Sequence, residues 1–316
     1  MAARILVVGA GSIGRRHAEN LTALGAVTRV LGWRETSADQ ILDILMAGQT
    51  DGLVIATATQ TRLDLIAAAG RAKVPFYVEK PLAFTPTGLA AMQAAAKSVA
   101  ARSMVGFMMR YHPAFRDLAH ADLSETFRFD LTIGHDVTQW RQNWRFSESY
   151  AAKPVGGGVL LDLCHEIDMA ACLFPGLSLG PVESMGHAAY PGVDMATRLM
   201  LAAPNGGLGS VSMDYLAPKL IRDARLCTPQ ATYSYDFAAQ SYSVTTLQGI
   251  ETRAFPLERN AMFLDAMRDW LALVEGRPVS GVEHLPRFDL VSESCALIAE
   301  SWQRRRFIGT MTKEIP

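Results

Sequence analysis

The chain has few cysteines, and they do not lie in pairs. Cys164, Cys172, Cys227 and Cys295 are widely scattered among 316 residues and form no CxxC motif. This pattern argues against a disulfide framework and against a zinc ribbon. We therefore expect a protein of the reducing cytoplasm.

The chain also lacks an excess of charge of either sign and any long apolar run. Thirty Lys plus Arg against 31 Asp plus Glu leave a formal net charge of -1, which provides no general attraction for nucleic acid or anionic lipid. The N-terminal apolar run is too short for a signal sequence, and no stretch approaches about 18 uninterrupted apolar residues. We expect no nucleic-acid partner and no membrane association.

The composition is that of a folded protein with buried cores. The chain is 49% hydrophobic and 19% charged. At roughly 150 residues a domain, its length predicts two domains. Residues 4–106 alternate short apolar runs with helical segments, which is typical of βαβ units and a parallel sheet. We predict a Rossmann domain, a doubly wound parallel sheet, over residues 1–115, with helices near 13–24, 38–46, 62–72 and 87–100 and strands in RILVV, VTRVLGW, GLVIATA, VPFYVEK and SMVGFMM.

After Ala114 the sequence changes to long alternating stretches such as TFRFDLTIG and LGSVSMDYL, which indicate an antiparallel sheet. Asn205 and Gly206 lie between two such stretches, and Asn-Gly supplies the positive φ angles of a tight hairpin. Two helical runs, 260–274 and 291–304, close the chain. We predict an α+β domain with an open, mostly antiparallel sheet over residues 116–316.

A glycine-rich turn follows the first predicted strand. In GAGSIGRRH, Gly9 allows a tight turn, Gly11 lets the backbone approach a pyrophosphate, and Gly14 lets the helix pack closely on the strand. The pyrophosphate of a dinucleotide would lie at the N-terminus of the helix that follows. We expect the turn and the first helical residues, including Ser12 and Ile13, to bind the cofactor.

The second cofactor determinant is expected about 20 residues further on, after the second strand. There the sequence is GWRETS. Arg34, with Thr36 and Ser37 nearby, could form a pocket for the 2′-phosphate of NADP, whereas Glu35 could hold a ribose hydroxyl of NAD. Either cofactor is compatible with these residues, and we favour NADP.

Two further segments contain candidate catalytic residues. In YVEKPLAF, Lys80 follows a strand at the carboxyl edge of the sheet, where it can donate a hydrogen bond to a substrate hydroxyl. In GGGVLLDLCHEID, Asp162 and His165 share one face of a predicted helix, so the carboxylate can orient an imidazole that acts as acid or base. The alternatives are a surface lysine beside a turn proline and a satisfied core histidine in a capped helix.

The three glycines of that second segment, Gly156, Gly157 and Gly158, also allow close approach of the backbone to a ligand. A metal ion held by Asp162 and its neighbours is less plausible, because adjacent helical residues point in divergent directions. We therefore expect no metal site.

Taken together, these segments resemble one family over essentially the whole chain. The resemblance is to the glucose-fructose oxidoreductase, inositol dehydrogenase and MocA (Gfo/Idh/MocA) family, and it rests on the order and spacing of GAGSIGRRH, IATATQT, VEKPLA, GFMMRYHPAF and GGGVLLDLCHEID. It implies NAD(P)-dependent hydride transfer to or from a hydroxyl or keto carbon of a sugar or polyol. It also implies that Lys80 contacts the reacting hydroxyl, that Asp162 and His165 complete the catalytic set, and that the sheet of the second domain makes a homodimer or homotetramer.

The same resemblance extends the cofactor site to three residues beyond the glycine turn. The loop IATATQT contributes Thr57 and Thr59, and VEKPLA contributes Glu79. The loop departs from the family pattern, with Ala58 where the family commonly has Pro and Arg62 where it commonly has His.

Two other departures concern spacing. The family usually has three residues between the Asp and the His, whereas this chain has two between Asp162 and His165, a rotation of about 100° on a helix. About twenty residues separate Trp33 from Leu53, where the family has room for a further helix and strand. We therefore predict that the Rossmann domain is shortened by one α/β unit.

Candidate substrate residues complete the expectations. Arg110 and Tyr111 match the segment that joins the domains in the family, although a salt-bridged Arg110 is the alternative. Trp140, Arg141 and Arg145 lie in TQWRQNWRFSESY, which we interpret as a substrate or subunit-contact loop. The alternatives to a sugar dehydrogenase are an NAD-dependent glycosidase of the same fold and a non-catalytic dinucleotide-binding regulator.

Overall fold

The computed structural model describes residues 2–139, 145–279, 281, 284–312 and 315. The chain forms two compact units, Met1–Tyr111 with Glu258–Ala296 (unit 1) and His112–Leu257 with Leu297–Pro316 (unit 2). This grouping differs from the expected division into residues 1–115 and 116–316, because a segment near the C-terminus returns to unit 1. Among the described residues, no helix is both long enough and apolar enough to cross a membrane.

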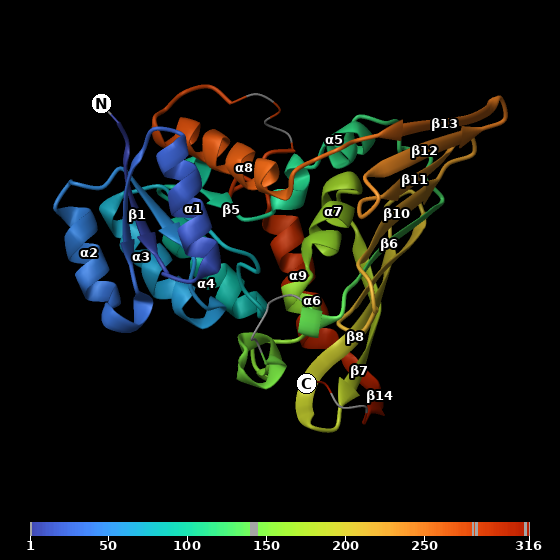
Figure 1. Cartoon of the computed structure of the whole chain (residues 1–316), viewed down its shortest axis with the longest axis horizontal. Coiled ribbons are helices and arrows are strands. Elements are labelled where there is room, and N and C mark those ends of the chain that lie inside the picture. The colour runs from blue at the N-terminus through green and yellow to red at the C-terminus, as the bar shows by residue number, and fades with distance from the viewer. Residues whose placement is uncertain (1, 140–144, 280, 282–283, 313–314, 316) are drawn as a thin grey trace. The chain divides into compact units, whose positions relative to one another are not determined.

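Unit 1 contains a parallel sheet of five strands in the order β2-β1-β3-β4-β5, which confirms the predicted Rossmann fold (Figure 1). Its strands are β1 (Arg4–Val8), β2 (Val27–Leu31), β3 (Gly52–Ile55), β4 (Phe76–Val78) and β5 (Met104–Val105). Its helices are α1 (Ser12–Ala23), α2 (Ala38–Met46), α3 (Arg62–Ala72), α4 (Pro86–Ala96) and α8 (Arg259–Val274). Short 3-10 helices are η1 (Trp33–Glu35), η2 (Thr59–Thr61), η3 (Ala100–Arg102) and η4 (Met108–Tyr111).

The sheet of unit 1 ends at β2. In the six-stranded dinucleotide fold a further strand lies outside the second one. Here only η1 and α2 lie between β2 and β3, so β2 is an edge strand and Val27 is 60% exposed. This arrangement agrees with the predicted loss of one α/β unit.

The helix α8 joins unit 1 through its apolar face. Trp270 is fully buried, and its ring packs edge-on against Tyr77 of β4 with centroids 6.1 Å apart. A Cβ atom on Gly52 would lie 3.0 Å from the same indole, so the glycine makes room for it. Burial of a tryptophan and its partners stabilises the return of this segment to unit 1.

Unit 2 contains a sheet of nine strands in the order β13-β12-β11-β10-β6-β9-β8-β7-β14. It is mostly antiparallel, with parallel pairs β6–β9 and β7–β14, which confirms the predicted open sheet. Its strands are β6 (Arg128–Gly134), β7 (Ser178–His187), β8 (Tyr190–Ala202), β9 (Leu208–Asp214), β10 (Ile221–Cys227), β11 (Thr232–Asp236), β12 (Ser241–Thr246), β13 (Gly249–Ala254) and β14 (Arg306–Met311).

Helices cover one face of this sheet, as Figure 1 shows for α5 and α7. The residues of β6 alternate, and Phe129, Leu131 and Ile133 are buried on the helical face. The helical elements of unit 2 are α5 (Pro113–Ala119), η5 (Val137–Gln139), η6 (Phe146–Glu148), η7 (Tyr150–Ala152), α6 (Val159–Asp162) and α7 (His165–Leu173), and α9 (Ser292–Arg304) spans the last boundary between the units. The predicted Asn-Gly hairpin joins β8 to β9, with Gly206 at φ +86° and Asn205 Oδ1 accepting from Gly207 N at 2.9 Å.

Candidate active site

The glycine turn of unit 1 has little free volume at two positions and an open side at the third. Gly9 has φ +119°, and a Cβ there would lie 2.3 Å from the carbonyl oxygen of Ala56. A Cβ on Gly14 would lie 1.9 Å from the carbonyl oxygen of Gly9, whereas a Cβ on Gly11 would meet no atom within 4 Å. The space in front of Gly11 and the free amides of α1, which has no acidic residue in its first turn, fit a pyrophosphate.

The segment after β2 contains the two residues expected to distinguish the cofactors. Arg34 and Glu35 are both exposed in η1. The Glu35 carboxylate turns back toward the end of β2, and its Oε2 would lie 3.5 Å from a Cβ on Gly32. Thr36 donates to the carbonyl of Gly32 at 2.9 Å, and Ser37 forms a capping box at the start of α2. Both hydroxyls expected beside a 2′-phosphate therefore have local partners.

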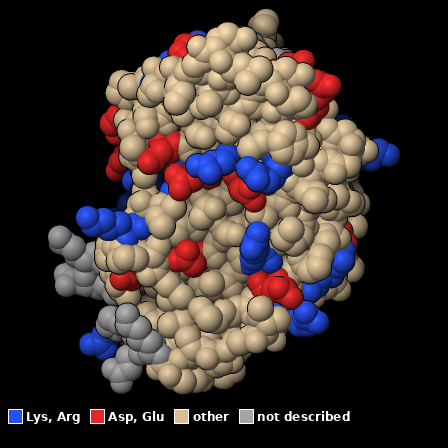
Figure 2. All heavy atoms as spheres, turned by 90° about the vertical axis from the view of Figure 1, so that its right-hand side faces the viewer, with Lys and Arg blue, Asp and Glu red and all other residues tan. Residues whose placement is uncertain are grey.

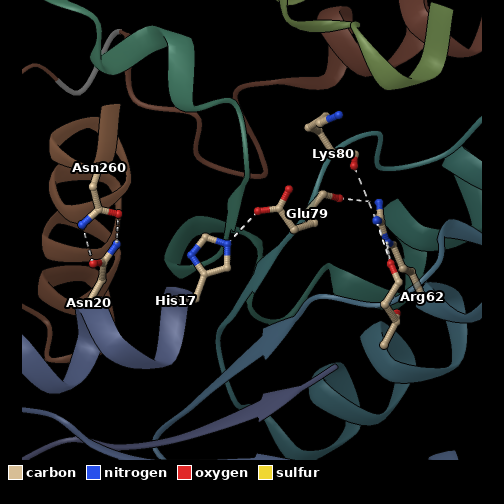
Figure 3. Close-up of polar contacts among 7 residues, drawn as sticks. His17, Asn20, Arg62, Glu79, Lys80 and Asn260 are labelled. Atoms are coloured by element: carbon tan, nitrogen blue, oxygen red, sulfur yellow. Dashed lines mark hydrogen bonds and ion pairs between the residues drawn. The ribbon is translucent and has the colours of Figure 1, made fainter. Parts of the chain in front are cut away.

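Glu79 at the end of β4 is paired with a buried histidine of α1 (Figure 3). His17 Nε2 donates to Glu79 Oε1 at 2.7 Å, and the two residues are 0% and 8% exposed. Burial alone raises the pKa of Glu79, but the hydrogen bond and charge of His17, with the charges of Lys80 and Arg62, hold that pKa below its usual value. Lys80 is half-buried, and its side chain points away from the His17–Glu79 pair in Figure 3.

Arg62 holds the other side of this segment. Its guanidinium, 4% exposed, donates to the main-chain carbonyls of Glu79 and Pro81 and, at 3.5 Å, to that of Lys80. It also donates to the carbonyl of Thr57 at 2.9 Å. The arginine that departs from the family pattern therefore ties the β3 loop to the segment that contains Lys80.

Among the other candidates of unit 1, Ser12 is exposed and Ile13 and Thr57 are half-buried, whereas three are buried. Thr59 is 8% exposed at the start of η2. Arg110 is 4% exposed and donates to Ser294 Oγ at 3.1 Å, and Tyr111 is 3% exposed. The hydrogen bond to Ser294 ties Arg110 to the C-terminal segment of unit 1.

In unit 2, Asp162 is a buried carboxylate that accepts two phenol hydrogen bonds. Tyr150 donates to Oδ1, and Tyr215 donates to Oδ2 at 3.0 Å. Burial, together with the negative charge of Asp162, raises the pKa of Tyr215 well above its usual value, so this phenol remains a donor at neutral pH. Asp162 is therefore oriented through both of its oxygens.

The expectation that Asp162 and His165 share one helix face is wrong. α6 ends at Asp162, Leu163 leaves the helix with φ -104° and ψ 31°, and His165 begins α7. Asp194 of β8 holds the start of α6 by accepting from Leu160 N at 2.8 Å. Contacts from other elements thus fix both ends of α6 and override the helical pattern of the sequence.

Two of the three glycines before α6, Gly157 and Gly158, lie against protein atoms. A Cβ on Gly157 would lie 2.4 Å from the carbonyl oxygen of Lys153. Gly158 has φ +92°, and a Cβ there would lie 2.0 Å from Asp194 Oδ1. We expected the backbone of these glycines to approach a ligand. The η7 turn and Asp194 occupy the space beside Gly157 and Gly158.

Asp194 and His17 are the main residues that the sequence interpretation missed. Asp194 is fully buried and forms an ion pair with Arg305 at 3.4 Å. Nothing in the local sequence of β8 marks it, whereas His17 lies in the quoted glycine motif. Of the predicted substrate residues, Trp140 and Arg141 lie outside the described residues, and Arg145 is exposed directly before η6.

Comparison with known proteins identifies the family of the Rossmann domain. Residues 3–107 match the model of an oxidoreductase family with an NAD-binding Rossmann fold. This match assigns the Rossmann domain of the chain to the Gfo/Idh/MocA family. Inositol 2-dehydrogenase of Acidothermus cellulolyticus is 32% identical to this chain over 132 residues, and the match covers 36% of the chain and 39% of that relative. This match therefore spans well under half the length of the relative.

Longer but weaker similarity extends over most of the chain. UDP-N-acetylglucosamine 3-dehydrogenase of Acidithiobacillus ferrooxidans is 23% identical over 295 residues, with 86% of the chain and 89% of that protein covered. The solved structure of an inositol dehydrogenase homolog complexed with NAD+ from Azotobacter vinelandii has a TM-score of 0.78 at 13% identity and covers 96% of the chain and 95% of its own. At such identity the structural likeness shows a shared fold.

Proposed function

We propose that this protein is an NAD-dependent oxidoreductase that transfers a hydride between the nicotinamide and a hydroxyl-bearing carbon of a sugar, polyol or sugar derivative. The observation that carries the proposal is the construction of unit 1, in which an open glycine turn and a half-buried Lys80, held from both sides, lie after strands of one parallel sheet. Ligands of α/β sheets bind at this carboxyl edge. The names of the dehydrogenase relatives support the substrate class.

The proposed chemistry assigns a role to each catalytic candidate. A bound nicotinamide dinucleotide, held at the glycine turn, would supply the hydride acceptor for the carbinol carbon. The hydroxyl proton must leave at the same time, and Lys80 donates a hydrogen bond to that oxygen while His165 accepts the proton. Asp162, held by two tyrosines, orients the substrate hydroxyl. Lys80 belongs to unit 1 and Asp162 and His165 to unit 2, so their action on one substrate is part of the proposal.

Steady-state kinetics with NAD+ and a panel of inositols, hexoses and UDP-N-acetylglucosamine test this function. We expect NADH formation with at least one cyclic polyol or sugar, and a loss of kcat of about 100-fold or more in Lys80→Ala and Asp162→Asn. Release of an aglycone without net NADH would instead indicate a glycosidase. Dinucleotide binding without turnover on any substrate would indicate a regulator.

We propose NAD rather than NADP as the cofactor, against the preference drawn from the sequence. The Glu35 carboxylate lies over the end of β2, where an acidic residue binds a ribose diol and repels a 2′-phosphate, while Thr36 and Ser37 have local partners. Separate titrations with NADH and NADPH, followed by energy transfer from tryptophan, test this choice. We expect Glu35→Ala to lose about tenfold in NADH affinity. A loss of NADPH binding in Arg34→Ala, with NADPH preferred by the wild type, would overturn the assignment.

We also propose that the protein is a homo-oligomer formed through the outer face of the nine-stranded sheet. The helices of unit 2 cover the other face, and Figure 2 shows Lys, Arg, Asp and Glu side chains interspersed on the open one. Paired positions there include Asp130 opposite Arg225 and Glu183 opposite Arg198. An interface with such charges is sensitive to salt. Light scattering at low and high NaCl should show a dimer or tetramer that dissociates as salt rises.

A further inference from the structure

The segment Glu79–Pro81 is held on one side by a buried side-chain pair. His17 lies about one helical turn after Gly14 in α1, and Glu79 directly follows β4. The His17 imidazole packs edge-on against Tyr77 and Phe263, with centroids 5.0 Å and 6.0 Å away. The hydrogen bond between His17 and Glu79 is 2.7 Å long and shielded from water. It is therefore stronger and more directional than the same contact on the surface.

The Glu79 carboxylate has little room to move away from His17. A Cβ on Gly106, after β5, would lie 3.2 Å from the carboxylate oxygens, so Glu79 fills the space above this glycine. Because its pKa lies below the usual value, Glu79 is ionised at neutral pH. Its carboxylate therefore accepts a charge-assisted hydrogen bond from His17. The side chain of the residue directly before Lys80 is therefore fixed.

The main chain of the segment is fixed from the other side. Arg62, at the start of α3, donates to the carbonyls of Glu79, Lys80 and Pro81 and to that of Thr57. One planar guanidinium thus binds the carbonyl groups of three consecutive residues centred on Lys80. Figure 3 shows these contacts for Glu79 and Lys80.

We propose that His17 and Arg62 are positioning residues for Lys80, His17 through the side chain of Glu79 and Arg62 through the main-chain carbonyls around the lysine. This inference rests on the proposed function, in which Lys80 contacts the reacting hydroxyl. His17 lies in α1, the helix that begins at the proposed cofactor turn. Through Glu79 it therefore links the segment that contains Lys80 to the same helix. Small displacements of a positioned group cost large factors in rate.

Asn20 supplies a matched control for the His17 contact. It lies in the same helix, is 5% exposed, and forms two side-chain hydrogen bonds with Asn260 of α8, at 2.9 Å and 3.3 Å (Figure 3). Asn20→Ala therefore removes a buried polar tie of α1 without touching the Glu79 segment. His17→Gln is the conservative variant, because its amide can donate to Glu79 from a similar reach.

The experiment measures kcat, the KM for NAD+ and the chemical reactivity of Lys80 in the full-length protein. Acetylation by acetic anhydride is quantified by peptide mass spectrometry and normalised to the exposed Lys97. In His17→Ala and in Arg62→Lys we expect kcat to fall about tenfold or more, the KM for NAD+ to change less than about threefold, and relative Lys80 acetylation to rise at least threefold. His17→Gln should restore both readouts toward wild type, and Asn20→Ala should move neither.

The outcomes separate this inference from the proposed function. If no substrate turns over, the proposed function fails, but a selective rise of Lys80 acetylation in His17→Ala and Arg62→Lys still supports the positioning role. Unchanged acetylation and kcat in both variants would overturn it. Equal changes in Asn20→Ala would also overturn it, because they would show a general loosening of α1. If His17→Ala does not fold, Arg62→Lys and His17→Gln decide.

Discussion

The surroundings of Lys80 in unit 1 and of Asp162 in unit 2 are built in different ways. Around Lys80, the side chains that matter belong to short motifs, since His17 follows the glycine turn and Arg62 follows the β3 loop. Around Asp162, they come from distant strands or loops, because Asp194 lies on β8 and Tyr215 follows β9. A site assembled from motifs is visible in the sequence, whereas a site assembled by a sheet becomes visible only once the sheet is known.

The largest expected effect concerns the strand contact that shapes the Asp162 region. Asp194→Ala removes the acceptor of Leu160 N and leaves the Arg305 guanidinium, 9% exposed, without its carboxylate. Breaking a buried pair in this way costs about 3–5 kcal/mol of the free energy of unfolding. Urea unfolding, monitored by circular dichroism, should show this loss.

The exposed pair Glu300–Arg304 of α9 is the control for that measurement. Its side chains are 47% exposed on both sides, so Glu300→Ala should change the free energy of unfolding by less than about 0.5 kcal/mol. If Asp194→Ala costs no more than this control, the Asp162 region does not depend on β8, and the contrast between the two regions disappears.

The second prediction divides the glycine turn of unit 1 into packing and ligand positions. Gly14→Ala places a Cβ 1.9 Å from the Gly9 carbonyl oxygen and should cost about 3 kcal/mol of stability. Gly11→Ala meets no atom within 4 Å and should fold normally, yet lose about tenfold or more in NADH affinity. Thermal unfolding and fluorescence titration measure the two effects. Normal NADH binding by Gly11→Ala would remove Gly11 from the cofactor site.

The elements with strong periodicity follow from the sequence because their burial pattern is local. The helix predicted at 38–46 is observed as Ala38–Met46, and the one predicted at 62–72 as Arg62–Ala72. The five predicted strands of unit 1 and the shortened sheet follow from alternating apolar runs and from the short interval between Trp33 and Leu53. These features need no knowledge of distant residues.

The rest depends on contacts between residues far apart in the chain. The break at Leu163 is set by Asp194 and by the tyrosines on Asp162, which periodicity cannot reveal. The return of α8 to unit 1 depends on where Trp270 finds an apolar partner, in this case Tyr77. His17 is the intermediate case, since its position in the motif was visible but its partner Glu79 lies 62 residues away.

The third prediction compares the two tyrosines that hold Asp162. Tyr215 is 1% exposed, so Tyr215→Phe leaves one oxygen of a buried carboxylate without its donor and should cost about 1–2 kcal/mol of stability. Tyr150 is 54% exposed, so water can replace its hydroxyl and Tyr150→Phe should cost about half as much. Chemical denaturation of both variants, with kcat measured alongside, tests this order. Equal losses of stability in the two variants would mean that burial of the tyrosine does not determine how much its hydrogen bond contributes.

The smallest expected effect is a pH dependence that belongs to unit 2 alone. Burial, followed by the positive charge of Arg222, lowers the pKa of His112 from 6.5 to about 4. Because the folded pKa lies below the unfolded one, the unfolded chain binds the proton more readily between these values. The contribution is therefore fully present above about pH 6.5 and declines as the pH falls toward 4.

Urea unfolding at pH 7 and pH 5 should show a loss of about 1 kcal/mol that is specific to this imidazole. His112→Asn provides the comparison, because the asparagine can still accept from Ala114 N at the start of α5 but does not titrate between these pH values. The variant should lose less stability than the wild type over the same interval. An identical loss in both would assign the pH dependence to other groups and would show that His112 is protonated in the folded protein as readily as in the unfolded chain.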